Sequence, residues 1–118
     1  MQNKQTKAGP VPDQDKAERR GRRLPINRRL FFFGEEEFEG EATLLDISTN
    51  GCRATSLTEV KIGILLKLSL FLQDQQWPLR VDQAVVRWVE GQCFGLEFIS
   101  IRPAQRERLR AILMKAKA

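Results

Sequence analysis

The spacing of apolar residues changes once along this chain, and that change limits the folds available to it. In the stretch "GILLKLSLFL" every second residue from Leu66 to Leu72 is leucine, which is typical of a strand that buries one face. After Pro103, which suits the first position of a helix, the apolar residues recur at helical spacing. They are Leu109, Ile112, Leu113 and Ala116. The pattern predicts a β-domain followed by a helix over residues 103–116.

Five other segments have the character of strands, bounded by Gly, Pro, Asn or Ser. They are "NRRLFFFG", "EATLLDIS", "GCRATSL", "PLRVDQAVVRWVEG" and "CFGLEFISI". The pair Asn50-Gly51 predicts a tight turn between the second and third of these segments. In the fourth, the core candidates are Val81, Ala84, Val86 and Trp88. Their uneven spacing predicts a β-bulge.

Consecutive strands with short turns favour a mostly β fold. We predict a small six-stranded antiparallel β-barrel with a C-terminal α-helix and a flexible, basic N-terminal arm. The 118 residues, of which 42% are hydrophobic, suffice for one domain with a modest core. Residues 1–17 are polar and contain Gly9, Pro10 and Pro12, so we expect a disordered leader there and a single domain over residues 18–118.

Several classes of protein are disfavoured by what the sequence lacks. It contains no histidine, and Cys52 and Cys93 are isolated from each other, so neither a metal cofactor nor the usual general base is expected. Both cysteines lie in apolar segments and are expected to be buried free thiols. No apolar run approaches the roughly 20 residues of a transmembrane helix, and the N-terminus lacks the apolar core of a secretory signal. We therefore expect a cytoplasmic protein without a membrane partner.

The positive charge is concentrated at one end of the chain. Residues 1–29 hold nine Lys or Arg against three Asp or Glu, while the remainder holds eleven against twelve, which together make the net charge of +5. A basic arm on a nearly neutral body indicates an anionic partner: a nucleic acid, a phosphorylated small molecule or an acidic surface.

The stretch "LLDISTNGCRATS" carries Asp46, Ser48 and Gly51 at D-x-S-x-x-G spacing. One interpretation is purely structural: Asp46 and Ser48 hydrogen-bond to their own turn, and Gly51 supplies a positive φ. The other is that these residues form half of a ligand site whose second half is the arginine run "ERRGRRLPINRR". The motif alone does not decide between the two.

The combination of features resembles the PilZ domain family of cyclic di-GMP receptors. Members of that family carry R-x-x-x-R at the entry to their first strand and [DN]-x-S-x-x-G between the strands that follow. Here Arg19 and Arg23 have the first spacing, and "RLPIN", "VRW" and "FGLEF" are further points of likeness. The resemblance runs from about Glu18 to the C-terminal helix.

The resemblance implies a binding module for cyclic di-GMP, with no other cofactor and no catalytic residues. In that reading Arg19 and Arg23, with Arg20 as a further candidate, contact the phosphates and guanines of the ligand. The barrel side of the pocket consists of Asp46, Ser48 and Gly51. A guanidinium suits this task because it can grip a phosphate, form a fork with guanine O6 and N7, and stack on a purine. A carboxylate such as that of Asp46 can accept hydrogen bonds from guanine N1–H and N2–H.

The resemblance further implies that ligand binding orders the arm and that an unidentified effector protein senses the change. One position departs from the family. Many members have an arginine directly before R-x-x-x-R, where this chain has Glu18, with the extra arginines Arg20 and Arg22 inside the motif. Since that position influences whether one ligand or a stacked pair binds, the stoichiometry stays open.

Two alternatives remain. A nucleic-acid-binding β-barrel would use the same basic arm on a phosphate backbone, but it leaves Asp46 and Ser48 without a role and is less favoured. A PilZ-like adaptor that binds no nucleotide would use only protein surfaces. Phe31, Phe32 and Phe33 cannot all face one side of a strand, so a partner surface is one interpretation of the exposed ring. Trp77 is expected to cover an end of the barrel.

Overall fold

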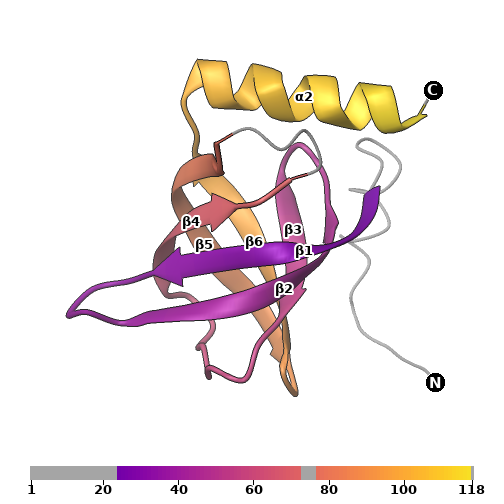
Figure 1. Ribbon diagram of the computed structural model, residues 1–118. Coiled ribbons are helices and arrows are strands. Elements are labelled where there is room, and N and C mark those ends of the chain that lie inside the picture. Colours follow the sequence, from indigo (N-terminus) through magenta and orange to yellow (C-terminus); the bar gives the residue numbers. More distant parts are fainter. Residues whose placement is uncertain (1–23, 73–76, 118) are drawn as a thin grey trace.

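A computed structural model describes residues 24–72 and 77–117 of the chain. Its six strands form a closed antiparallel barrel in the order β1-β2-β3-β6-β5-β4, and a helix, α2, lies across one end of it (Figure 1). The elements are β1 (Leu24–Phe33), β2 (Glu39–Ile47), β3 (Gly51–Thr55), β4 (Leu65–Leu70), β5 (Leu79–Glu90), β6 (Cys93–Ser100) and α2 (Pro103–Lys117). The mostly β fold, the six-stranded barrel and the C-terminal helix are confirmed.

The alternating leucines of β4 line the interior as predicted. Leu66, Leu68, Leu70 and Leu72 are buried, while Lys67 and Phe71 between them are exposed. Strand β1 adds Leu30 and Phe32, which are fully buried, and the Phe32 ring meets Phe94 of β6 edge to face at 5.9 Å between centroids. The interior of the barrel is thus one apolar core with aromatic contacts between opposite strands.

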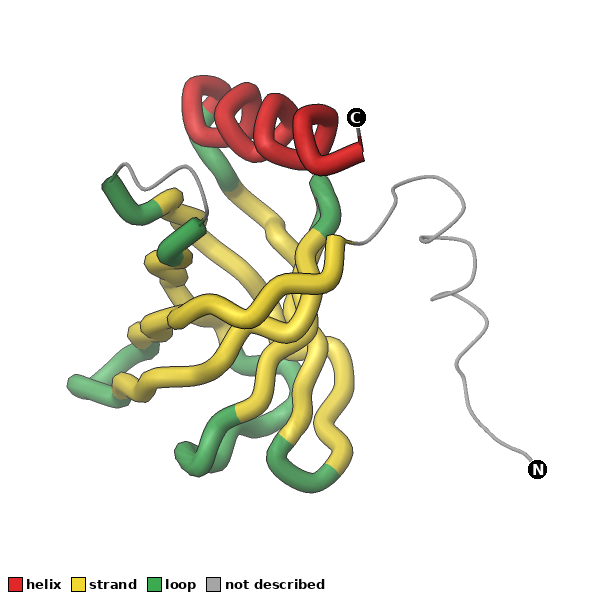
Figure 2. Tube along the Cα trace, turned by 45° about the vertical axis from the view of Figure 1, so that its right-hand side comes forward, coloured by secondary structure: helices red, strands yellow, loops and turns green. Residues whose placement is uncertain are grey.

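Helix α2 closes one end of this core (Figure 2). Its residues Leu109, Ile112 and Leu113 are buried in the core cluster, as their helical spacing predicts. On the side nearest the β2–β3 turn, the Arg106 Nη1 donates to the Thr49 carbonyl at 3.5 Å. No helix in the described part of the chain is long and apolar enough to span a membrane.

Strand β1 begins earlier than the sequence pattern indicates. The apolar pattern suggests a start near Asn27, but Leu24 and Pro25 already pair with Ile47 and Asp46 of β2. A register irregularity follows between Pro25 and Arg28. Proline has no N–H to donate, so it is tolerated where a bulge interrupts the ladder, and this is why Pro25 does not end the strand.

The prediction that Trp88 belongs to the core is wrong. A bulge in β5 was predicted, and register shifts do occur, one of them between Val86 and Trp88. Because a bulge places one extra residue on the strand, the residues after it change sides. Val86 is buried and Val89 packs against the core, whereas Trp88 is half-buried and lies opposite Gly95.

The expectation that both cysteines are buried free thiols is only partly met, and the expectation that Trp77 covers an end of the barrel is wrong. Cys52 is buried and Cys93 is half-buried, and both are free thiols. Cys93 begins β6 at the hairpin, where less of the barrel covers it. Trp77 does not cover a barrel end, because its side chain is 80% exposed.

Candidate functional site

Asp46 lies at a bulge near the end of β2. A register shift between Leu44 and Asp46 separates the buried Leu44 from the aspartate and places Asp46 opposite Arg53 of β3. The Arg53 Nε donates to Asp46 Oδ2 at 2.6 Å, and the aspartate side chain is 7% exposed against 48% for the arginine. The barrel therefore holds a nearly buried carboxylate whose cationic partner is open to solvent.

Ser48 lies in the turn that follows β2. Its N–H donates to the Gly51 carbonyl at 2.8 Å, and its hydroxyl donates to the same oxygen at 3.3 Å. The hydroxyl also accepts from the Asn50 N–H at 3.4 Å. Ser48 is buried, so its hydroxyl stabilises the local backbone of the turn, which agrees with the structural interpretation of this residue.

Gly51 does not serve the turn through a positive φ, and that interpretation is wrong. Among the glycines of the described ranges, positive φ occurs at Gly63 and Gly91. A Cβ at Gly51 would instead lie 2.3 Å from the carbonyl oxygen of Leu96 in β6, which is too close for any side chain. Glycine is required here because β3 and β6 approach each other closely.

Strand β6 and helix α2 also hydrogen-bond to the turn from Ser48 to Gly51. The Phe98 N–H donates to the Asn50 carbonyl at 2.8 Å, and Arg106 of α2 reaches the Thr49 carbonyl. Strand β6 and helix α2 thus fix the turn at the end of the barrel under the helix (Figure 1).

The structure brings Asp46, Ser48 and Gly51 together at one corner of the barrel. The arginines predicted to complete the site, Arg19, Arg20 and Arg23, lie outside the described residues, as does the leader over residues 1–17. The first described residue, Leu24, lies opposite Ile47, and Pro25 lies opposite Asp46. The chain therefore enters the barrel beside the D-x-S-x-x-G segment.

Sequence reasoning missed a row of residues that crosses four neighbouring strands. By register, Asp46 lies opposite Arg53, Arg53 opposite Gly95, and Gly95 opposite Trp88. A Cβ at Gly95 would meet the Trp88 Nε1 at 2.1 Å, so the indole lies directly across the glycine. A signal for Arg53 was present, because a two-residue hairpin loop at Thr49-Asn50 places residue 53 opposite residue 46.

The chemistry offered by this corner is that of a polar binding site. Within the described ranges there is no group of three His, Cys, Asp or Glu residues that could hold a metal ion. The corner presents a half-exposed guanidinium on a nearly buried carboxylate and a turn fixed by hydrogen bonds, and the row that starts there ends three strands away in a half-buried indole.

The barrel resembles several solved structures. The Bacillus subtilis inhibitor of motility, MotI/DgrA, matches with a TM-score of 0.69 at 18% identity over 82% of this chain and 50% of that chain. Escherichia coli YcgR in complex with c-di-GMP matches with a TM-score of 0.69 at 16% identity over 83% of this chain and 45% of that chain. The PilZ domain of CeSA from a cellulose-synthesizing bacterium has a TM-score of 0.63 at 9% identity over 81% of this chain and 98% of that chain.

At these identities the likeness shows a shared fold, and this chain spans about half the length of the MotI/DgrA and YcgR structures. No curated protein matches the sequence. The sequence itself matches the PilZ domain over residues 17–115, which includes the arginine run, every strand and nearly all of α2. The chain therefore belongs to the PilZ domain family.

Proposed function

We propose that this domain is a receptor for cyclic di-GMP. Two of the similar structures, Escherichia coli YcgR and its PilZ domain, contain c-di-GMP, and the arginine run and D-x-S-x-x-G motif of this chain have the spacing described above. The ligand is a doubly charged anion with two guanines, which suits a basic arm beside a polar corner of the barrel.

The observation that carries the proposal is the pairing at the start of β1. Leu24 lies opposite Ile47 and Pro25 opposite Asp46. Arg23 directly precedes Leu24, and consecutive Cα atoms are about 3.8 Å apart. Arg19 lies five residues before Leu24, a contour of at most about 18 Å. The arginines are therefore tethered within reach of any ligand bound at Asp46.

The corner supplies complementary groups. Arg53 is half exposed although it binds Asp46, so its guanidinium can approach a phosphate or a guanine edge while the carboxylate stays neutralised. The row ends in the half-buried indole of Trp88, and an indole face can stack on a purine.

The arm provides the switch in this proposal. Its arginines repel one another, and a ligand with two phosphates removes that repulsion and folds the arm onto the barrel, at an entropic cost. An effector protein then senses the reshaped surface. We place this function in the cytoplasm, because that compartment is compatible with the proposed ligand and keeps the two free thiols reduced.

Calorimetric titration of the purified chain with cyclic di-GMP tests the proposal, with GTP as the control ligand. We expect saturable binding of cyclic di-GMP and none of GTP. Arg23→Ala removes one charge-assisted contact and should weaken binding by about 1.5–3 kcal/mol. Arg80→Ala is the matched control, since Arg80 is an exposed arginine of β5, and it should bind as the wild type does. Absence of binding, or equal losses in the two variants, contradicts the proposal.

The same titration addresses the stoichiometry. With Glu18 in place of a further arginine, we expect one ligand per chain. Glu18→Arg restores the family pattern, so it should raise the number of ligands bound toward two. A wild-type ratio of two would show that Glu18 does not limit binding.

A further inference from the structure

Away from this corner, the outer face of β1 and its two neighbours is rich in exposed aromatic side chains. Phe33 and Phe71 are each 40% exposed, and the Phe31 and Phe71 rings pack edge to face at 5.6 Å between centroids. The registers of β1 with β2 and β4 place nine residues on this face: Arg29, Phe31 and Phe33 in β1, Thr43, Glu41 and Glu39 in β2, and Lys67, Ser69 and Phe71 on the β4 side. We call these nine residues the aromatic face.

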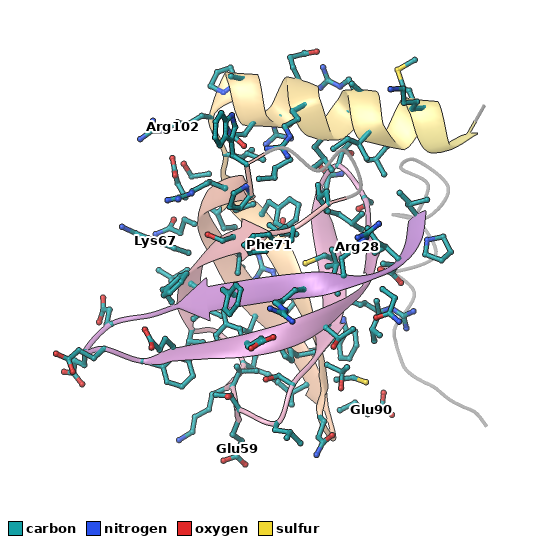
Figure 3. The ribbon with its side chains drawn as sticks, in the orientation of Figure 1. Arg28, Glu59, Lys67, Phe71, Glu90 and Arg102 are labelled. Atoms are coloured by element: carbon teal, nitrogen blue, oxygen red, sulfur yellow. The ribbon has the colours of Figure 1, made fainter. Side chains whose placement is uncertain are left out.

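The aromatic face has a projecting ring near one end and a hollow near the other. Phe33 is the last residue of β1. At the opposite end a hollow of about 500 Å³ is lined by Arg28, Arg29, Thr43 and Phe71, among others. Arg29 and Phe33 are four residues apart, or about 13 Å along the strand. Figure 3 shows Phe71 beside β1, between Lys67 and Arg28.

The two ends of this face complement each other, and at its middle Glu41, which lies opposite Phe31, is paired with Arg29 at 2.9 Å between Oε2 and Nε. We propose that the aromatic face binds a second copy of the chain about a two-fold axis that crosses the strands at the level of Phe31 and Ser69. Such an axis exchanges the two ends of β1, so Phe33 of each copy enters the hollow of the other. There it meets Arg29, and Lys67 likewise meets Phe71, which are favourable pairs of cation and aromatic ring. In an isologous interface each of these contacts occurs twice.

The charged residues at the two ends of the aromatic face also complement each other under the proposed two-fold axis. The β1–β2 hairpin beyond Phe33 carries Glu35, Glu36 and Glu37, all exposed. At the other end Arg28 is exposed and lines the hollow together with Arg29. The proposed axis brings the acidic hairpin of one copy against Arg28 of the other. This complementarity is the reason to favour a second copy of this chain over an unrelated protein.

The aromatic face is separate from the proposed ligand site. It lies on β2, β1 and β4, whereas the row from Asp46 to Trp88 lies on β2, β3, β6 and β5. In the closed ring, β1 and β6 lie on opposite sides. Self-association through the aromatic face therefore uses none of the residues in the row from Asp46 to Trp88, and the proposal does not depend on the function proposed above.

Sedimentation equilibrium of the full chain over a range of concentrations tests the proposal. We expect a reversible dimer of twice the 13.6 kDa chain mass. Phe33→Lys removes the ring and sets a second cation against Arg29 of the other copy, so it should raise the dissociation constant at least tenfold. Circular dichroism should show an unchanged fold because Phe33 is exposed. Leu57→Lys is the matched control, since Leu57 is 88% exposed and lies off the aromatic face, and it should leave the constant unchanged. A monomer up to millimolar concentration overturns the proposal, as does a dimer that Phe33→Lys does not weaken.

Cross-linking locates the axis independently. Facing sheets lie about 10 Å apart, so a short bismaleimide should join two copies of Ser69→Cys, the position on the axis. The half-buried Cys93 is first replaced by serine. Leu57→Cys in the same background is the control and should give little dimer. Equal yields from the two variants contradict the proposed axis.

Discussion

Asp46 and Arg53 face each other across β2 and β3, and a charged hydrogen bond of 2.6 Å joins their side chains. The carboxylate is nearly buried and the guanidinium is half exposed. This pair lies at the first step of the row that leads to Trp88, so it connects the stability of the barrel corner to the proposed binding chemistry.

Replacement of Arg53 should destabilise the fold measurably. Arg53→Ala removes a cation from a nearly buried carboxylate, and we expect a loss of about 1–2 kcal/mol in the free energy of unfolding. Arg87→Ala is the control, because its ion pair with Glu97 is exposed on both sides and such pairs contribute about 0–1 kcal/mol. Urea denaturation of both variants gives the comparison, and equal losses would argue against a special role for the buried carboxylate.

Gly51 should tolerate no side chain. Gly51→Ala places a methyl group against the Leu96 carbonyl, and backbone cannot move aside as a flexible side chain can. We expect a loss of about 2 kcal/mol or more in thermal or denaturant unfolding. At Gly34 the nearest atom is Phe38 Cδ2 at 3.1 Å, which belongs to a ring, so Gly34→Ala should cost less. The reverse order would show that the β3–β6 approach is not what requires glycine.

Gly95→Ala should displace the indole of Trp88. The added Cβ would fall on the Trp88 ring, and the ring must turn out toward solvent. In a Trp77→Phe background, which removes the 80% exposed indole, we expect a red shift of the remaining emission and stronger quenching by acrylamide. Unchanged emission would mean that the indole does not lie on Gly95.

The two thiols should differ in reactivity. Cys52 is buried and Cys93 is half-buried, so a disulfide reagent such as Ellman's should modify Cys93 in the native protein and Cys52 only after unfolding. Cys93→Ser should then show almost no fast reaction. Two fast equivalents in the wild-type protein would contradict this assignment.

Most of the fold was accessible from residue periodicity. The strict alternation from Leu66 to Leu72 and the helical spacing after Pro103 have few structural interpretations, and burial matches both. The error at Trp88 occurred where a bulge breaks the period. Trp88 shares its strand with Val86 but lies beyond a register shift, and sequence spacing alone does not show where the extra residue is inserted.

The candidate site was predictable only in part. Asp46, Ser48 and Gly51 were found by their spacing, but the role of Gly51 depends on β6, a strand more than forty residues later in the chain. Arg53 could have been inferred from the hairpin register. Arg106 could not, because its contact with Thr49 arises from the docking of α2, which no local pattern specifies.

The closed order of the strands has a consequence for how this domain meets other molecules. Each of the six strands is hydrogen-bonded to a neighbour on both sides, so the barrel offers no edge onto which a foreign strand could be added. Recognition by β-augmentation, common among open sheets, is thereby closed to it, and so is the edge-to-edge aggregation that open sheets risk. A partner of this barrel must therefore contact side chains on its walls, its turns or its helix.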